Sequence, residues 1–215
     1  MVVSPEAFAA QLNYLAQNDY HVVPLTALLD FLGGQRPLPK RAVVLTFDDG
    51  YASFYHYAFP LLKEHGFPAT VFLYSDFVGA RDALTWPQMV EMAASGLIEI
   101  QAHSKTHANL AYRLPDEDEA HYRKRLEAEV RVPRDVLQSK LREPVTTFAY
   151  PYGDTNGVLM DLLAKADYQL AVTVHPGANP FFAFPLALNR SMIFGDDDID
   201  AFKAKLQTYR QVDLQ

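Results

Sequence analysis

Two adjacent carboxylates and a spaced pair of histidines are the residues of this sequence best suited to chemistry. Asp48 and Asp49 directly follow one apolar run of the chain, and His103 and His107 follow another. Neighbouring carboxylates at the end of a buried strand oppose each other's ionisation, and a bound cation would relieve that cost. Two imidazoles four residues apart can hold one ion, and one of the two aspartates would complete a two-histidine, one-carboxylate set. Such a set leaves positions open for water and substrate, so these residues predict a catalytic metal site.

Each motif alone is weak evidence for a site. An Asp-Asp-Gly sequence is most often an ordinary turn, and two histidines at this spacing are more often separate surface or core residues. A third segment, from Tyr150 to Gly153, follows a further apolar run at 146–149. In a parallel α/β fold the site forms where strands end and loops begin, so we expect the three segments at one edge of the sheet. Their joint placement is what predicts a functional site.

Seven short apolar runs alternate with helical patterns and indicate the fold class. Runs that are apolar throughout are typical of strands covered on both faces, and strand and helix in alternation are typical of parallel crossovers. The sequence therefore predicts an α/β fold of barrel-like (β/α) type, with the site at the C-terminal ends of the strands. The predicted strands are residues 21–24, 43–47, 69–74, 98–102, 146–149, 170–174 and 187–193.

Helices are predicted between and around these strands. Ser4 and Pro5 are typical of an N-cap and a first helical residue, so the chain is expected to begin with a helix. Pro133 is expected to break or kink the long charged helix around it. No linker rich in Gly, Ser or Pro divides the chain, so we predict a single domain over residues 1–215. The further predicted helices are residues 25–33, 53–65, 86–95, 117–141, 156–166 and 198–208.

Composition excludes several classes of function. The 215 residues include 19 Lys and Arg against 26 Asp and Glu, which gives a net charge of −7. That sign is wrong for a protein held by nucleic-acid phosphates, so no nucleic-acid partner is expected. No apolar run reaches the roughly 18 residues of a transmembrane helix, so no transmembrane segment is expected in this chain. Cysteine is absent, which excludes disulfides and thiolate metal ligands.

Three motifs in a fixed order carry a specific resemblance. They are LTFDDGY at 45–51, HSKTH at 103–107 and FAYPYG at 148–153. Together they resemble the first three motifs of the NodB-homology polysaccharide deacetylases, the fourth carbohydrate esterase family. The segments at 60–73 and 84–107 resemble the branch that deacetylates poly-β-1,6-N-acetylglucosamine and related envelope polysaccharides. The similarity runs from about residue 5 to about residue 206, and it implies a distorted (β/α) barrel of about seven strands.

This resemblance implies roles for the residues of the three motifs. Asp48 would be the general base, which accepts a proton from the attacking water. Asp49, His103 and His107 would bind a divalent metal that polarises the acetamide carbonyl and the water. Zinc is expected first, and nickel or cobalt could use the same ligands. The backbone N–H of Tyr152 would donate to the tetrahedral oxyanion.

The chain departs from the family pattern at two places. Ala149 stands in the region where the third motif commonly begins with an arginine that braces the catalytic aspartate. Arg190, at the end of the last predicted strand, could supply a guanidinium to Asp48 instead, and a plain surface arginine is an equally good interpretation. The histidine that many members use as general acid is not recognisable. His175 is the internal candidate, although a His-Pro-Gly sequence is more often only a turn.

The missing acid and the location of the protein rest on the same resemblance. In the poly-N-acetylglucosamine branch a histidine sits on an early strand, whereas the similarity here starts abruptly at about residue 5. We therefore hypothesise that a first strand is missing from this chain. The first residues lack the basic and apolar regions of a secretory signal. The resemblance nevertheless implies an extracytoplasmic location, in the periplasm or cell envelope.

The leading hypothesis is a metal-dependent hydrolase that removes N-acetyl groups from an N-acetylglucosamine polysaccharide or oligomer and releases acetate. The first alternative is a catalytically weakened carbohydrate-binding module of a larger envelope protein, since the arginine brace and the acid are not evident. A structural domain of an envelope assembly is the second alternative. Trp86 and Tyr152 are the aromatic residues expected to stack on a sugar. The sequence leaves the oligomeric state open.

Overall fold

A parallel sheet of five short strands organises the molecule. The structure is a computed structural model that describes residues 3–207. The strands lie in the order β3–β4–β5–β6–β7, and each neighbouring pair is parallel. Their bounds are Thr46–Phe47 for β3, Ala69–Leu73 for β4, Ile98–Ala102 for β5, Thr147–Ala149 for β6 and Leu170–Val172 for β7. Because the strands are all parallel, their carboxyl ends lie at one edge.

Burial explains why these segments are strands. Every residue of β4, β6 and β7 is buried, as expected for apolar runs that are covered on both faces of a sheet. The predicted (β/α) barrel type is therefore confirmed, in the form of a curled sheet of five strands that closes only part of a barrel. Two of the predicted strands, 43–47 and 187–193, are not single strands of the structure.

The predicted strand at 43–47 is divided between two sheets. Its first part belongs to β2 (Ala42–Val43), which pairs in parallel with β1 (His21–Val22) in a separate two-stranded sheet. Two residues later the Leu45 carbonyl accepts a hydrogen bond from the N–H of Thr70, and β3 joins β4. The chain thus changes its pairing partner within what the sequence pattern presents as one apolar run.

The predicted last strand at 187–193 is wrong as a strand. Leu188 makes only an isolated parallel bridge with Val172. At Asn189 the side-chain amide of Asn179 accepts from the backbone N–H and donates to the backbone carbonyl, at 2.8 and 2.9 Å. The Asn189 groups face away from β7, and the Thr173 carbonyl that a continued parallel ladder would offer to the N–H of Arg190 accepts from the Arg190 Nε instead, so the ladder stops at Leu188. The segment still runs beside β7, where the N–H of Arg190 donates to the carbonyl of His175.

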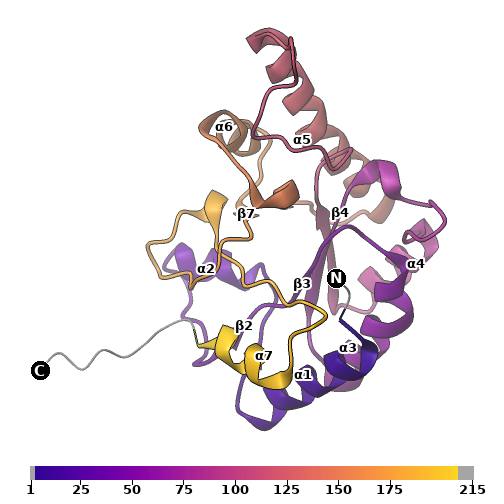
Figure 1. The fold of residues 1–215 in the computed structure, drawn as a ribbon, viewed down its shortest axis with the longest axis vertical. Helices are drawn as coiled ribbons and strands as arrows, with labels where there is room; N and C mark the ends of the chain where they lie inside the picture. The colour runs from indigo at the N-terminus through magenta and orange to yellow at the C-terminus, as the bar shows by residue number, and fades with distance from the viewer. Residues whose placement is uncertain (1–2, 208–215) are drawn as a thin grey trace, which may run out of the picture.

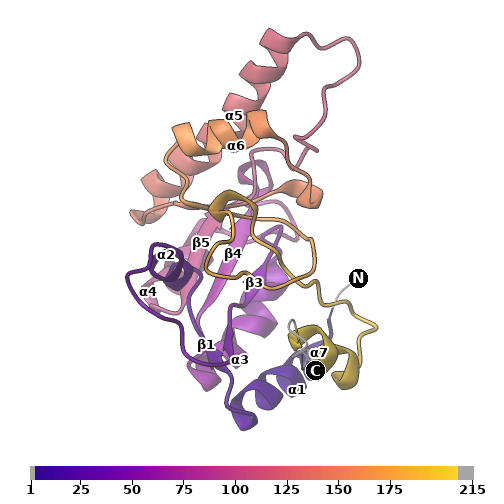
Figure 2. The same ribbon diagram turned by 90° about the vertical axis from the view of Figure 1, so that its left-hand side faces the viewer.

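Helices surround the sheet (Figures 1 and 2). Helices α4 and α5 pack against β5, α6 packs against α5, and α1 packs against α3 and α7. The helix bounds are Pro5–Gln17 for α1, Ala27–Leu32 for α2, Phe59–His65 for α3, Trp86–Ala94 for α4, Glu119–Leu141 for α5, Gly157–Lys165 for α6 and Ile199–Leu206 for α7. A π-helical turn, η1 (Phe54–Ala58), precedes α3, and short 3₁₀ turns occur at η2 (Ser75–Phe77), η3 (Pro151–Gly153) and η4 (Pro185–Ala187).

The predicted start of the first helix is confirmed, whereas the predicted break in the longest helix is not. Helix α1 begins at Pro5 as predicted, and the hydroxyl of Ser4 accepts a hydrogen bond from the N–H of Ala7. Of the break or kink predicted at Pro133, the break is wrong, because α5 continues through this residue. Proline removes only one hydrogen bond of the helix, and the buried Val130 and Leu137 on either side of it keep α5 packed on the core.

Within residues 3–207, no helix is both long and apolar enough to cross a membrane. The single domain over residues 1–215 stays a prediction, and its ends, together with the last residue of the predicted helix 198–208, lie outside the described residues.

Candidate active site

Three loops meet at the carboxyl edge of the sheet and carry the predicted site residues. Asp48 and Asp49 follow β3, His103 follows β5, and the turn η3 follows β6. In the sheet β4 separates β3 from β5, while β5 and β6 are neighbours. Because all strands of the sheet are parallel, these loops leave it at the same edge.

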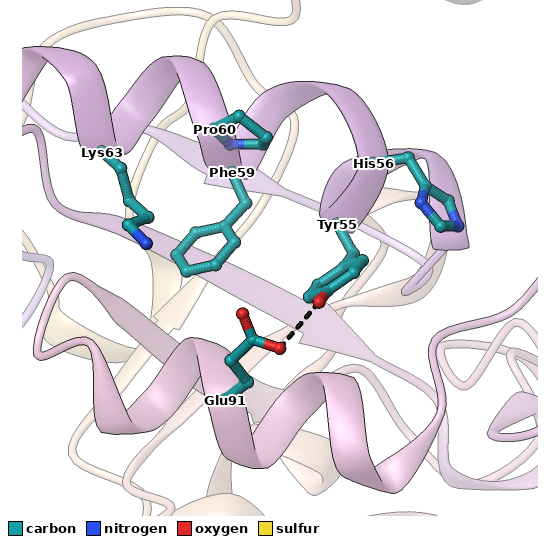
Figure 3. Close-up of a pocket in the computed structure, with 6 residues that line it drawn as sticks. All are labelled: Tyr55, His56, Phe59, Pro60, Lys63 and Glu91. Carbon is teal, nitrogen blue, oxygen red and sulfur yellow. Dashed lines mark hydrogen bonds between the residues drawn. The ribbon is translucent and has the colours of Figure 1, made fainter.

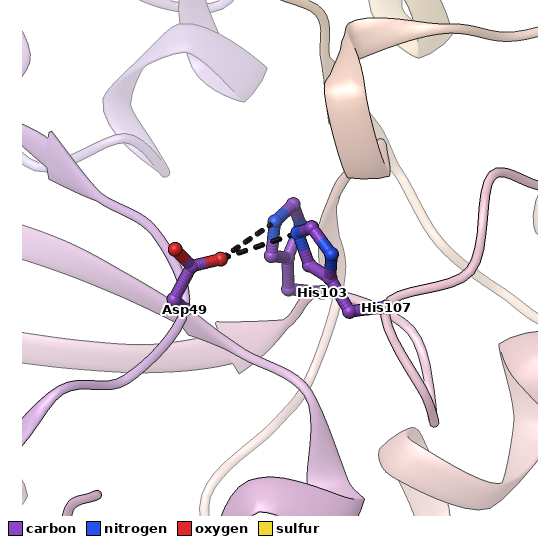
Figure 4. Close-up of side chains that lie close together, drawn as sticks. All are labelled: Asp49, His103 and His107. Atoms are coloured by element: carbon purple, nitrogen blue, oxygen red, sulfur yellow. Dashed lines mark ion pairs between the residues drawn. The ribbon is translucent and has the colours of Figure 1, made fainter. Parts of the chain in front are cut away.

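Asp49, His103 and His107 bring three ligand atoms together (Figure 4). The Asp49 Oδ1 lies 3.6 Å from the Nε2 of His103 and 3.2 Å from the Nε2 of His107. His103 is buried, with 2% of its side chain exposed, whereas 33% of Asp49 is exposed. The cluster is therefore anchored in the core on one side and open to solvent on the other.

A backbone carbonyl fixes the tautomer of His103. The Nδ1 of His103 lies 2.7 Å from the carbonyl oxygen of Ala149. A carbonyl can only accept, so Nδ1 carries a proton and donates it, and Nε2 of the neutral ring presents a lone pair to Asp49. Partners of this kind orient histidine ligands in metal sites.

The donor set of this cluster fits a divalent cation. With Nδ1 protonated, His103 can face the Asp49 carboxylate only as an imidazolium or across a cation. Metal bonds of about 2.0–2.2 Å place neighbouring ligand atoms of one ion roughly 3.0–3.5 Å apart, close to the two distances seen here. When the imidazoles of His103 and His107 do donate, their hydrogen bonds hold the pKa of the Asp49 carboxyl well below its ordinary value. Asp49 is therefore ionised and available as a ligand.

Four residues of this site have a backbone conformation that L-residues rarely adopt. The φ angles are +74° at Asp49, +73° at Ser104, +63° at His107 and +63° at Tyr152. Each such residue costs on the order of 1–3 kcal/mol, and such residues cluster at functional sites. Their concentration in the three loops indicates that the loop geometry matters more here than local stability.

Arg190 makes a two-pronged ion pair with Asp48. Its Nη1 and Nη2 donate to Oδ1 and Oδ2 of the carboxylate at 2.7 and 2.8 Å. Of the two alternatives left open by the sequence, the structure thus places this arginine at Asp48 and not on the free surface, with 14% of its side chain exposed. This geometry orients the carboxylate plane and uses one lone pair of each oxygen.

The environment of Asp48 keeps it ionised. Burial by itself would raise the pKa of this carboxyl. The charge of Arg190 and its hydrogen bonds, with a smaller contribution from His103, outweigh the burial and hold the pKa of Asp48 below its ordinary value. Asp48 therefore carries a negative charge at neutral pH although it lies beside Asp49.

Arg190 also connects the two edges of the five-stranded sheet. Its Nε donates to the carbonyl of Thr173, just after β7, at 2.7 Å. Its Nη1 donates to the hydroxyl of Thr46 in β3 at 3.1 Å. The guanidinium lies above the ring of the buried Phe72, with 5.7 Å between the Cζ and the ring centroid. One side chain thus ties β3 to the segment after β7 where the barrel is open.

Comparison with known proteins identifies the family of this chain. Residues 35–171 match the polysaccharide deacetylase family. The chain belongs to this family. Poly-β-1,6-N-acetyl-D-glucosamine N-deacetylase of Escherichia coli (strain K12) is 29% identical over 211 residues, which cover 82% of this chain and 31% of that protein. The chain thus spans about a third of the length of that relative.

Two further proteins are similar to most of the chain. The Bacillus subtilis (strain 168) protein YxkH is 30% identical over 209 residues, which cover 97% of this chain and 71% of YxkH. The solved structure of the Streptococcus pyogenes deacetylase PplD in complex with acetate matches with a TM-score of 0.85 at 26% identity. That match covers 96% of this chain and 88% of PplD, so the polysaccharide deacetylase fold extends over nearly the whole chain.

Three further residues predicted from the sequence lie in different parts of this polysaccharide deacetylase: one beside His107, one on the loop after β7 and one at the start of α4. Tyr152 is exposed, and its ring meets that of His107 edge to face with 4.9 Å between centroids. His175 is exposed on the loop after β7, and its backbone carbonyl accepts from Arg190. Trp86 begins α4 and packs against the core, with the Lys140 ammonium above its ring. Sugar contact at Trp86 stays a prediction.

Tyr74 is a residue of the site that the sequence reasoning missed. Its ring lies 5.2 Å from that of His107 and stacks on Phe77 at 5.0 Å, and Phe77 in turn meets Tyr51. Burial raises the pKa of Tyr74, and Tyr51 and Asp49 raise it further, so its hydroxyl stays protonated. Tyr74 directly follows β4, so the strand-end rule that found the other loops would also have found it.

A hollow on the outer side of the molecule contains none of the predicted site residues (Figure 3). It lies between the η1–α3 segment and α4, where the Tyr55 hydroxyl donates to Glu91 at 2.7 Å. The Lys63 ammonium lies above the ring of Phe59, with 5.3 Å between the Nζ and the ring centroid. The lining residues are Tyr55, His56, Phe59, Pro60, Lys63 and Glu91.

Proposed function

We propose that this chain is a metal-dependent hydrolase that removes N-acetyl groups from an N-acetylglucosamine polysaccharide and releases acetate. One observation carries the proposal: the ligand cluster of Asp49, His103 and His107 lies directly beside Asp48, a second carboxylate held by Arg190. The name of the Escherichia coli relative supports poly-β-1,6-N-acetylglucosamine as the substrate. The acetate in the PplD structure is the acid that such a hydrolysis would release here, which supports the same reaction.

The proposed metal ligands are the Asp49 carboxylate and the Nε2 atoms of His103 and His107. A divalent ion at this position supplies Lewis-acid polarisation of the acetamide carbonyl and lowers the pKa of water. Zinc suits two imidazoles and one carboxylate, and nickel or cobalt suits them as well. Three protein ligands leave coordination positions for water and substrate.

Asp48 is the proposed general base. The oxygen of a water bonds to the acetamide carbonyl carbon while Asp48 takes one proton of that water. Arg190 leaves a lone pair free on each carboxylate oxygen and fixes the direction in which it points. The Tyr152 N–H, on a backbone turned by its positive φ, is the proposed donor to the resulting oxyanion.

Breakage of the C–N bond requires a proton for the leaving amine. His175 is the candidate acid within the described residues, because its backbone carbonyl accepts from the N–H of Arg190 and so places it near Asp48. Its side chain is exposed, and it makes no hydrogen bond or ion pair within residues 3–207. The His175→Ala variant tests this role, since loss of the acid should lower kcat by about 10²-fold or more. Unchanged kcat would remove His175 from the mechanism.

Acetate release is the test of the proposed function. The protein is loaded with zinc and incubated with a β-1,6-linked N-acetylglucosamine pentamer, with a β-1,4-linked pentamer as the linkage control. We expect acetate from the β-1,6 pentamer and none after removal of the metal with a chelator. Saturable binding of the pentamer without acetate would contradict the proposal and favour the carbohydrate-binding module. Faster release from the β-1,4 pentamer would contradict the proposed substrate only.

The proposal includes the setting of the reaction. We propose that residues 1–215 act as one deacetylase domain on envelope polysaccharide outside the cytoplasm, as the substrate named for the Escherichia coli relative suggests. Acetate release by this chain, without any added segment, would support the first part. Fractionation of cells that produce the native protein would test the second part, and we expect the protein outside the cytoplasm.

A further inference from the structure

We propose that Glu129 is a positioning residue that holds the loop carrying His103 and His107 in its metal-binding shape. The inference rests on the proposed metal site. Glu129 lies in the middle of α5, and only 5% of it is exposed. Its Oε2 accepts the backbone N–H groups of Lys105 and Thr106, both at 2.9 Å, and its Oε1 accepts the Thr106 hydroxyl at 2.7 Å.

The carbonyl side of the same loop is held by a different element. The N–H groups of Ser75 and Asp76 in η2 donate to the carbonyls of Ser104 and Lys105 at 3.2 and 3.0 Å. Lys105 also forms an ion pair with Asp76 at 2.6 Å. The loop between the two histidines therefore lies between two supports, α5 for its N–H groups and η2 for its carbonyls.

The ends of the loop are fixed as well. The N–H of His103 donates to the carbonyl of Leu73 at 2.8 Å. The N–H of His107 donates to the hydroxyl of the buried Ser104 at 2.9 Å. Glu129 is thus the one side chain from outside the loop that accepts from its backbone within the described part of the chain.

The loop needs such support because its backbone is strained. Ser104 and His107 both have positive φ angles, and residues in that region persist only where the surroundings fix them. The turn at these residues is also what aims both imidazoles at Asp49. Removal of Glu129 would leave two N–H groups without their acceptor and let the loop relax, which separates the Nε2 atoms of the two histidines.

Four variants distinguish a positioning role from a general contribution to stability. Glu129→Ala removes all three acceptor contacts, and Glu129→Asp keeps the charge but withdraws the oxygens by one methylene. Glu129→Gln keeps an amide oxygen that can accept both N–H groups. Glu99→Ala is the matched control, because Glu99 is a carboxylate that accepts from the hydroxyls of Thr26 and Thr70 and makes no contact with the loop.

Zinc affinity and amide exchange are the two measurements. Zinc affinity is measured by competition with a chromophoric chelator, and hydrogen–deuterium exchange of residues 103–107 is measured on the metal-free protein. We expect zinc affinity to fall about 10–100-fold in Glu129→Ala and Glu129→Asp, with faster exchange of the loop. Glu129→Gln and Glu99→Ala should stay within about threefold of the parent protein, whatever their melting temperatures.

The outcomes separate this proposal from the proposed function. Parent-like zinc affinity in Glu129→Asp, or unchanged loop exchange in it, would overturn the role of Glu129 even if Glu129→Ala failed to fold. A larger loss in Glu129→Gln than in Glu129→Asp would also overturn it, since charge and not hydrogen-bond geometry would then matter. If the parent protein binds no zinc, the proposed metal site fails, and loop exchange alone decides whether Glu129 holds the loop.

Discussion

Both oxygens of the Asp48 carboxylate accept hydrogen bonds from the guanidinium of Arg190, which lies 142 residues later in the chain. The pair joins the first strand of the sheet to the segment that follows the last one. It performs two tasks with one side chain: it orients the proposed base, and it links the open edges of the partial barrel.

Replacement of Arg190 should therefore affect activity strongly. We expect Arg190→Ala to lower kcat by about 10²-fold, because a misplaced base loses its alignment with the water. Arg190→Lys should recover only part of that loss, since an ammonium cannot make two parallel hydrogen bonds to a carboxylate. Initial rates of acetate release measure both variants. Arg134→Ala is the control, because Arg134 donates to the carbonyl of Val145, ahead of the amino end of β6, and pairs with Asp167. Full activity in Arg190→Lys would mean that charge alone suffices.

The roles of the two aspartates can be separated. Asp48→Asn should keep zinc but lose turnover by on the order of 10²–10⁴, the usual contribution of a positioned base. Zinc content by mass spectrometry and acetate release are measured on the same preparation. Loss of zinc from this variant would show that Asp48 and Asp49 had been assigned the wrong way round.

Removal of any proposed ligand should abolish tight zinc binding. We expect His103→Ala, His107→Ala and Asp49→Ala each to lose zinc and activity while remaining folded, because a catalytic metal contributes less to folding than a structural one. Circular dichroism checks the fold, and chelator competition checks the metal. His121→Ala is the control, since His121 is exposed on α5 and pairs with Asp118. Full zinc occupancy in two of the three ligand variants would rule out this metal site.

The ion pair of Asp48 and Arg190 predicts a specific dependence of stability on pH. The pKa of Asp48 is lowered in the folded state, so the pair stabilises the fold fully above the unfolded pKa, about 3.9. That contribution is lost as the pH falls below this value through the folded pKa. The difference in unfolding free energy between the parent and Asp48→Asn, which removes the titrating carboxyl, should be constant from pH 7 to pH 5 and shrink below about pH 4, with both proteins free of metal. A decrease above pH 5 would point to a histidine instead.

Gly50 should be irreplaceable because of a close contact beside the site. Its φ is +81°, and a Cβ added there would lie 2.7 Å from the Cβ of Leu73. Gly79 has the same φ with no atom within 4 Å of its added Cβ, so Gly79→Ala isolates the backbone strain. We expect denaturant unfolding to give a loss of about 1 kcal/mol for Gly79→Ala and at least about 2 kcal/mol more for Gly50→Ala. Equal losses would show that Leu73 moves aside freely.

Residue types and spacing were sufficient for the part of the site that lies at the strand ends of one parallel sheet. Asp49, His103 and His107 each sit at or just after a strand, so the parallel order of the strands by itself brings them to one edge. The same reasoning predicted the (β/α) fold class. Buried parallel strands are apolar throughout, and their alternation with helical patterns makes them recognisable in a sequence. Ser4 at the start of α1 was predictable for a similar reason, since a helix cap is a local interaction.

The tertiary structure alone decided the contacts that cross the molecule. No local pattern indicates that Arg190 reaches Asp48, that the Ala149 carbonyl orients His103, or that Glu129 supports the histidine loop. These partners lie between 23 and 142 residues apart, and two of the three contacts use backbone groups that every residue carries. The ends of the predicted strands 43–47 and 187–193 were equally hidden. An apolar run continues as a strand only while the N–H and carbonyl groups of a neighbouring strand lie beside it. Those groups come from distant parts of the chain, so only the folded structure determines where the strand ends.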